Sequence, residues 1–266
     1  MQAGKSTLIA AALLMVCGCG QPANNAAGAG DSAGAASEAK YQAAPELTGA
    51  SIARDGGVEL VGRASPGAAV RLTSPGAPAQ FATADSSGLW RLTVAGAAEP
   101  RLFGLSMSAG GQVVQAMGYL FVAPGQIARL RVGGGTQVLG AGDRGVAALA
   151  LDYDSQRAVT VSGLAAPGET VSLRADGIER GQASADRSGR FTLSLTGQPL
   201  TAGPHDFELL SPSGDVRFSA NIGAPAPLSG TPFAARREGA AWRIDWITPG
   251  GGEQTTLILD RAGGGQ

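Results

Sequence analysis

The sequence predicts an all-β protein in which two tandem antiparallel β-sandwiches are followed by a C-terminal β-hairpin. A signal peptide and a disordered tether are expected to precede them. Three observations predict this class: an internal repeat, alternation of apolar and polar residues inside each repeat, and turn-forming residues between the alternating segments. No segment after residue 19 shows an apolar period of 3.6 with caps, which would indicate a helix.

Composition excludes several functional classes. Only 15% of the 266 residues are charged and the formal net charge is −1, so there is no basic surplus for a dedicated nucleic-acid binder. There is one histidine, and both cysteines lie within the first 19 residues. His/Cys metal sites and cysteine nucleophiles are therefore excluded from the body of the chain, and we expect no metal and no cofactor.

The first 18 residues have the layout of a secretory signal peptide. A polar start carrying Lys5 precedes an apolar run over residues 8–16 that is too short to span a bilayer. The run ends in Val-Cys-Gly-Cys at 16–19, which resembles the lipobox of bacterial lipoproteins. An ordinary secretory signal with incidental cysteines is the alternative.

The lipobox resemblance implies cleavage before Cys19 and a diacylglyceryl group on its sulfur, so that the protein is held on a membrane by its lipid. Cys19 fits best because the small Gly18 precedes it. In the Gram-negative lipoproteins that this segment resembles, a residue other than Asp after the cysteine implies the outer membrane, and here that residue is Gly20. The folded part would then face the periplasm or the cell surface.

Residues 19–45 are predicted to be the lipidated cysteine and a flexible tether. Ala, Gly, Ser and Asn dominate residues 20–45, and no large aliphatic residue is present to offset the entropy cost of ordering the chain. Such a tether would let the folded part stand off the membrane.

An internal repeat is the most informative feature. Residues 58–94 and 159–195 align without a gap at an offset of 101, with 14 of 37 positions identical. Short segments of the copies, such as 90–94 and 191–195, have apolar residues at every second position, which indicates strands with one buried face. Trp90 of the first copy corresponds to Phe191 of the second, and both lie on the apolar face, so we expect both in the core.

Turn residues recur at the same positions in both copies. Pro66-Gly67 and Pro167-Gly168 suit type II turns, in which proline fixes φ and glycine accepts a positive φ. Asp85 and Asp186 each begin a four-residue segment that ends in glycine, which favours type I turns with the carboxylate capping backbone N–H groups.

This order of motifs resembles the bacterial immunoglobulin-like modules that occur in tandem on secreted proteins and adhesins. It also resembles the carboxypeptidase-regulatory-like β-sandwich. The resemblance implies one module over 46–124 and another over 146–223. Such modules are usually spacers, scaffolds or binding modules.

Two segments lie outside the repeat. Residues 125–145 are expected to be a linker in which Ile127–Val132 and Thr136–Leu139 flank three glycines as a hairpin. Residues 224–266 are expected to hold a Pro-rich connector and then a C-terminal β-hairpin, with strands over 241–247 and 255–259.

Three motifs of possible chemical interest favour structural readings. Gly140–Gly145 matches G-x-G-x-x-G, but a strand-like run follows where a nucleotide site needs a helix. His205 is expected at the surface, with no G-x-S-x-G motif to indicate a nucleophile. Asp152 and Asp154 supply too few oxygens for calcium, which takes 6–8 ligands.

Trp242 and Trp246 are the candidate binding residues. Exposed, the two indoles would form a platform for sugar rings or an aromatic partner, and buried they would close a core.

The sequence shows no assembled catalytic set. We therefore expect a lipid-anchored, non-enzymatic envelope protein whose sandwiches act as scaffold or binding modules for a protein or an envelope polymer. A polysaccharide-acting enzyme or accessory using the Trp242/Trp246 face and a passive spacer are the alternatives.

Overall fold

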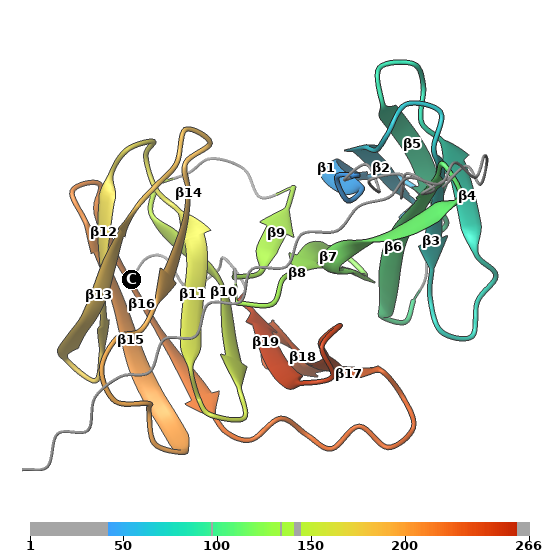
Figure 1. Cartoon of the computed structure of the whole chain (residues 1–266). Coiled ribbons are helices and arrows are strands. Elements are labelled where there is room, and N and C mark those ends of the chain that lie inside the picture. Colours follow the sequence, from blue (N-terminus) through green and yellow to red (C-terminus); the bar gives the residue numbers. More distant parts are fainter. Residues whose placement is uncertain (1–41, 97, 134, 141–144, 260–266) are drawn as a thin grey trace, which may run out of the picture. The chain divides into compact units, whose positions relative to one another are not determined.

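A computed structural model describes residues 42–96, 98–133, 135–140 and 145–259. The predicted signal peptide, Cys19 and most of the predicted tether lie outside these residues. The described part of the chain contains nineteen β-strands and no helix (Figure 1). The predicted all-β sandwich class is confirmed. None of the described segments forms a helix of the length and apolar character that crossing a membrane requires.

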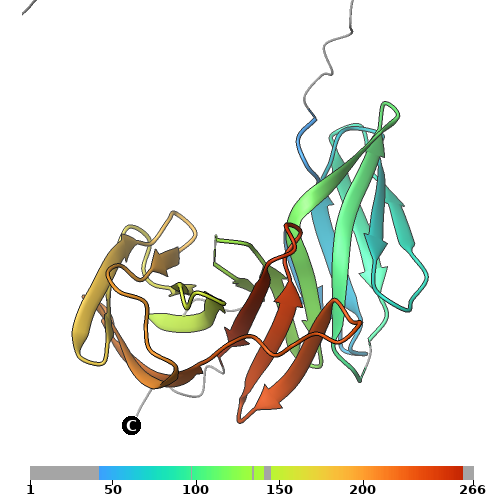
Figure 2. The same cartoon turned by 60° about the horizontal axis from the view of Figure 1, so that its bottom comes forward.

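The first module is a sandwich of two antiparallel sheets (Figure 2). One sheet has the order β1-β2-β5, and the facing sheet begins β4-β3-β6-β7. The strands are β1 (Glu46–Ile52), β2 (Val58–Arg63), β3 (Ala69–Thr73), β4 (Gln80–Thr83), β5 (Leu89–Val94), β6 (Arg101–Ala109) and β7 (Gln112–Ala123). Their inward side chains form one hydrophobic core that includes Leu60, Val70, Trp90 and Phe103.

The second module repeats this strand order, with β10-β11-β14 facing β13-β12-β15-β16. Its strands are β10 (Ala147–Asp154), β11 (Val159–Leu164), β12 (Thr170–Ala175), β13 (Ile178–Ser184), β14 (Arg190–Ser194), β15 (Gly203–Ser211) and β16 (Gly214–Ile222). Seven strands in two sheets is the architecture of immunoglobulin-like modules. The repeat extends to detail: an irregularity in the β1–β2 register at Thr48 recurs 101 residues later at Leu149, between β10 and β11. The predicted boundaries 46–124 and 146–223 stay predictions.

Each module places a large aromatic ring over a glycine on the neighbouring strand. Trp90 pairs with Gly62 across β2 and β5, and Phe191 pairs with Gly163 across β11 and β14. A Cβ atom at Gly62 would lie 2.1 Å from a backbone carbonyl oxygen of β1 and 2.2 Å from the Trp90 ring. One at Gly163 would lie 2.0 Å from a backbone carbonyl oxygen of β10 and 2.7 Å from the Phe191 ring. The glycine recurs in both copies because a backbone carbonyl and the ring together occupy the space that a side chain would need. Both rings are buried, as predicted.

The recurrent turns have the predicted geometry. Gly67 and Gly168 adopt φ values of 73° and 80°, and in the first copy the N–H of Ala68 donates to the carbonyl of Ser65 at 2.9 Å. The Asp85 carboxylate accepts hydrogen bonds from the backbone N–H groups of Ser87 and Leu89, at 2.8 and 2.9 Å. Asp186 does the same in the second copy.

Five further strands extend one sheet of each module. β8 (Gln126–Leu130) and β9 (Gln137–Leu139) continue the β4-β3-β6-β7 sheet, and β19 (Glu253–Ile258), β18 (Ala241–Ile247) and β17 (Phe233–Glu238) continue the sheet from β10. The predicted C-terminal hairpin is therefore β18–β19. Strand β17 and the pairing of β19 with β10 were not predicted from the sequence.

The two extensions pack on each other and form a third hydrophobic core (Figure 2). The residues of this third core come from β6, β7, β8 and β9 on one side and from β10, β11, β18 and β19 on the other. They are Leu102, Phe121, Ala123, Ala128, Leu130, Val138, Leu149, Ala150, Leu164, Trp242, Ile244, Trp246 and Ile258.

Candidate functional site

The two tryptophans predicted as candidate binding residues lie in the third core. Trp246 is 0% exposed and Trp242 is 8% exposed. Trp246 makes an edge-to-face contact with Tyr119 at 5.7 Å between ring centroids, and Trp242 makes a similar contact with Phe121 at 5.9 Å. The structure therefore supports the buried alternative, and neither ring forms an exposed platform.

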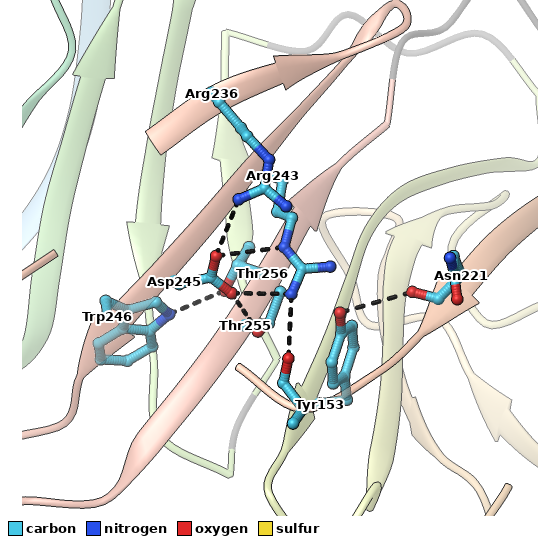
Figure 3. A network of polar contacts seen from close by, with 9 residues as sticks. Tyr153, Asn221, Arg236, Arg243, Asp245, Trp246, Thr255 and Thr256 are labelled. Carbon is cyan, nitrogen blue, oxygen red and sulfur yellow. Dashed lines mark hydrogen bonds and ion pairs between the residues drawn. The ribbon is translucent and has the colours of Figure 1, made fainter. Parts of the chain in front are cut away.

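Beside the third core, Asp245 on β18 organises a buried polar network (Figure 3). Arg243 donates two hydrogen bonds to its carboxylate at 3.2 and 3.0 Å, and the Thr255 hydroxyl donates a third at 2.6 Å. Arg236 on β17 completes the set at 3.3 Å. Burial alone would raise the pKa of Asp245, but the hydrogen bonds from Arg243 and Thr255 lower it below its ordinary value. This network ties the three C-terminal strands together.

A second buried carboxylate, Asp152 on β10, ties the linker to β19. It accepts hydrogen bonds from the Thr136 backbone N–H at 2.6 Å, the Thr136 hydroxyl at 2.7 Å and the Thr256 hydroxyl at 2.5 Å. Gln254 donates a fourth at 3.3 Å. Burial raises the pKa of Asp152 in spite of these bonds. No group of three or more His, Cys, Asp or Glu placed to hold a metal occurs within the described ranges.

His205 is buried, so the predicted surface position is wrong. The side chain is 7% exposed because the start of β15 packs against the turn that carries Asp176. Its Nδ1 lies 2.6 Å from Asp176 Oδ2, and its Nε2 lies 3.0 Å from the Thr201 carbonyl oxygen. Burial lowers the pKa of His205, but the Asp176 and Thr201 contacts raise it more, and the pKa lies above its ordinary value. Both partners of the ring are hydrogen-bond acceptors, and an imidazolium can donate to both of them. This arrangement suits a structural link between the two segments rather than a catalytic base.

The glycine-rich segment at 140–145 leads into strand β10. Residues 141–144 lie outside the described residues. A strand follows where a nucleotide site needs a helix, and the linker turn stays a prediction.

A surface cavity lies beside a bulge in β7, and we call it the bulge pocket. On β7, Ala116–Gly118 stand opposite the single residue Leu105 on β6. Gly118 has a φ of 87°, and a Cβ there would lie 1.9 Å from the Leu130 carbonyl oxygen. The bulge turns Met117 outward, where its side chain is 81% exposed.

The bulge pocket has a volume of about 270 Å³. Its lining residues come from the segment before and within β1, from β6, from the β7 bulge, and from β8 and the residue after it. They are Ala44, Pro45, Glu46, Leu47, Leu105, Ala116, Met117, Gly118, Tyr119, Leu120, Arg129 and Arg131. This site was not among those predicted from the sequence. The available signal was a glycine inside an apolar strand, which often marks a bulge.

Two arginines at the bulge pocket differ in how they are paired. Arg129 contacts the Glu46 carboxylate at 3.4 Å, the Leu47 carbonyl oxygen at 3.2 Å and the Gln137 side-chain oxygen at 2.6 Å. Arg131 is exposed, and it makes no hydrogen bond or ion pair with any other described residue. The pocket therefore combines apolar walls with the Arg129–Glu46 ion pair and with one cation, Arg131, that has no partner in the described part of the chain.

Comparison with protein-family models finds no match, and comparison with curated proteins finds none. Among solved structures, the chain is similar to "Central Fibronectin-III array of RIM-binding protein", with 13% identity, 77% of this chain and 71% of that chain covered, and a TM-score of 0.26. It is also similar to invasin, described as a bacterial integrin-binding protein, with 12% identity, coverages of 80% and 54%, and a TM-score of 0.22. The chain thus spans about half of the invasin chain. Likenesses this weak carry no argument about function, and the fold rests on the strand order above.

Proposed function

We propose that this is a lipid-anchored, non-enzymatic envelope protein whose two immunoglobulin-like modules form a scaffold that presents a binding surface to a protein partner. The observation that carries the proposal is the third core. Its residues connect the two modules through β8, β9 and the C-terminal strands. The two modules therefore share a packed core and together support the proposed binding surface. The buried ionisable groups Asp152, Asp245 and His205 are each engaged by structural hydrogen bonds.

The polysaccharide-acting alternative loses its main support in this structure. It required the Trp242/Trp246 face to be open to sugar rings, and both indoles are buried. The bulge pocket, by contrast, is accessible and holds an unpaired cation, which supports a binding role for the first module.

The lipid anchor is tested by Cys19→Ala. We expect this variant to leave the membrane fraction and appear as soluble protein, because the sulfur that would carry the lipid is gone. Cys17→Ala is the matched control and is expected to stay on the membrane. Membrane retention of Cys19→Ala, measured by fractionation and immunoblotting, would show that the anchor assignment is wrong.

The binding role is tested by site-specific photo-crosslinking in cells. The chain has lysines only at positions 5 and 40, so amine-reactive reagents would not sample the modules. A photoreactive residue in place of Met117 is expected to capture one protein, identified by mass spectrometry. The same residue in place of Thr93, which is exposed on the opposite sheet, is the control. Equal capture at both positions, or none, would reject the binding role and leave the spacer alternative.

A further inference from the structure

Over half of β7, the sheet edge beside the bulge pocket pairs with no other strand of the described ranges. Strand β7 has twelve residues, but β8 pairs only with Tyr119–Ala123, and β6 covers the other side. Beyond the end of β8, the outer edge of Gln112–Met117 has no paired strand among the described residues. Such an edge presents backbone N–H and C=O groups in the spacing that an added strand uses.

The bulge pocket lies where this open edge meets the end of β8. Its lining includes Met117 and Gly118 from the bulge and Arg131, the first residue after β8. On the opposite side, Ala44 and Pro45 pass the pocket and make no backbone–backbone hydrogen bond with β7. The open edge and the pocket therefore form one continuous surface.

We propose that this surface binds an extended polypeptide segment that adds to the edge of β7, inserts one apolar side chain into the bulge pocket and pairs a carboxylate with Arg131. This inference deepens the proposed function, because it names the class of partner for the binding surface.

Three features select this ligand chemistry. The open edge recognises a repeating backbone of amide groups, which an extended peptide has and an acyl chain lacks. A cavity of about 270 Å³ that is also open suits a single side chain. Arg131 is an exposed cation at the rim of the pocket. It favours a peptide that carries Asp or Glu beside the apolar residue inserted into the pocket. Met117 forms an adaptable apolar wall, because an unbranched thioether side chain adjusts to ligands of different shape.

The test is selection of a phage-displayed library of random linear peptides on the full-length protein, followed by fluorescence anisotropy with the enriched peptides. We expect enriched peptides to place an apolar residue near Asp or Glu. Methylation of alternate backbone nitrogens in such a peptide should weaken binding at least about tenfold, because it removes strand hydrogen bonds.

Two pairs of variants localise the binding. Ala44→Trp fills the bulge pocket and is expected to weaken peptide binding about tenfold or more, whereas Ala43→Trp, at an exposed position outside the pocket, is not. Arg131→Glu is expected to weaken binding about fivefold or more. Arg91→Glu, which makes the same charge change on the opposite sheet, is not.

Several outcomes would overturn the proposal. They are the absence of any enriched peptide, binding that Ala44→Trp leaves intact, and binding that tolerates backbone methylation. Saturable binding of a dansylated fatty acid that Ala44→Trp blocks, without peptide enrichment, would instead assign the pocket to a lipid. The assay uses purified protein, so failure of the membrane anchor in the Cys19→Ala experiment would leave this result unaffected.

Discussion

At the residue scale, the clearest agreement between sequence and structure concerns Trp90 and Phe191. Their positions in alternating segments predicted burial, and the structure adds the reason why Gly62 and Gly163 accompany them. A side chain on either glycine would collide both with a backbone carbonyl oxygen of the neighbouring strand and with the facing ring. The pairing itself was not predicted, because apolar period 2 indicates which face a residue occupies but not which strand lies next to it.

This pairing leads to a stability prediction. Trp90→Ala and Phe191→Ala should each lower the free energy of unfolding by about 3–5 kcal/mol, since each removes a buried ring and leaves a cavity above a glycine that cannot fill it. Urea titration followed by circular dichroism would measure the change. Phe81→Ala is the control, because Phe81 is largely exposed, and its effect should stay within about 0.5 kcal/mol. Near-neutral results for the buried pair would contradict the assigned cores.

His205 is the residue for which sequence reasoning failed. A lone histidine after a Gly-Pro turn has no local signal of burial, because the partner that buries it, Asp176, lies 29 residues earlier in a different turn. Only the pairing of β12 with β15 brings the two side chains together.

The His205–Asp176 contact predicts a pH dependence of stability. The folded-state pKa of His205 is raised above 6.5, so its contribution is fully present below that pH and is lost as pH rises through the folded-state pKa. The pKa of Asp176 is lowered from 3.8, chiefly by the hydrogen bond with His205, so its contribution is lost only as pH falls through that lowered value. Arg180 opposes the charge on His205.

The melting temperature of the protein should therefore fall as pH rises from 6 to 9. The melting temperature of the His205→Gln variant should fall less over the same range. Differential scanning calorimetry at several pH values would measure both. Parallel curves for the two proteins would show that His205 does not carry the pH dependence.

At the element scale, the sequence of strand β10 carries a signal of burial on both faces that the predictions did not use. Its segment AALALDYD is almost continuously apolar, which is typical of a strand buried on both faces. The structure confirms this, because Leu151 and Tyr153 face the second module's core while Leu149 and Ala150 face the third core. The second face is covered by strands β6 to β9 of the other sheet. This packing could not be predicted, because an apolar run shows that a strand is buried but not which sheet lies against it. Strand β17 lacks clear alternation and carries no comparable signal.

The C-terminal strands depend on the buried carboxylate of Asp245. Asp245→Ala should destabilise the protein by about 3 kcal/mol, because it leaves the Arg243 guanidinium in a buried position without its partner. Urea unfolding would measure the loss, with Asp215→Ala, which removes an exposed carboxylate, as a control expected to change stability by less than about 0.5 kcal/mol. Equal effects of the two substitutions would contradict a structural role for the Asp245 network.

At the scale of the whole molecule, the third core joins the two copies of the repeat, which the sequence alone suggests are independent units. Two copies of one module, considered from sequence alone, suggest two independent units on a linker. The structure instead places linker strands and C-terminal strands in one shared core. The first module contributes Leu102 and Phe121 to this core, and the second contributes Leu149 and Leu164. The added segments outside the repeat therefore connect the copies, and a partner bound to the first module would be held by a support that includes the second.

This shared core predicts that the two modules unfold together. The protein should show a single calorimetric transition, whereas Trp246→Ala, which removes the largest fully buried side chain of the third core, should separate it into two transitions. Trp90→Ala, a loss of the same size inside the first module alone, should leave the coupling between modules intact and lower the temperature of one common transition. Two transitions in the unsubstituted protein, or a single unsplit transition in Trp246→Ala, would mean that the third core does not couple the modules.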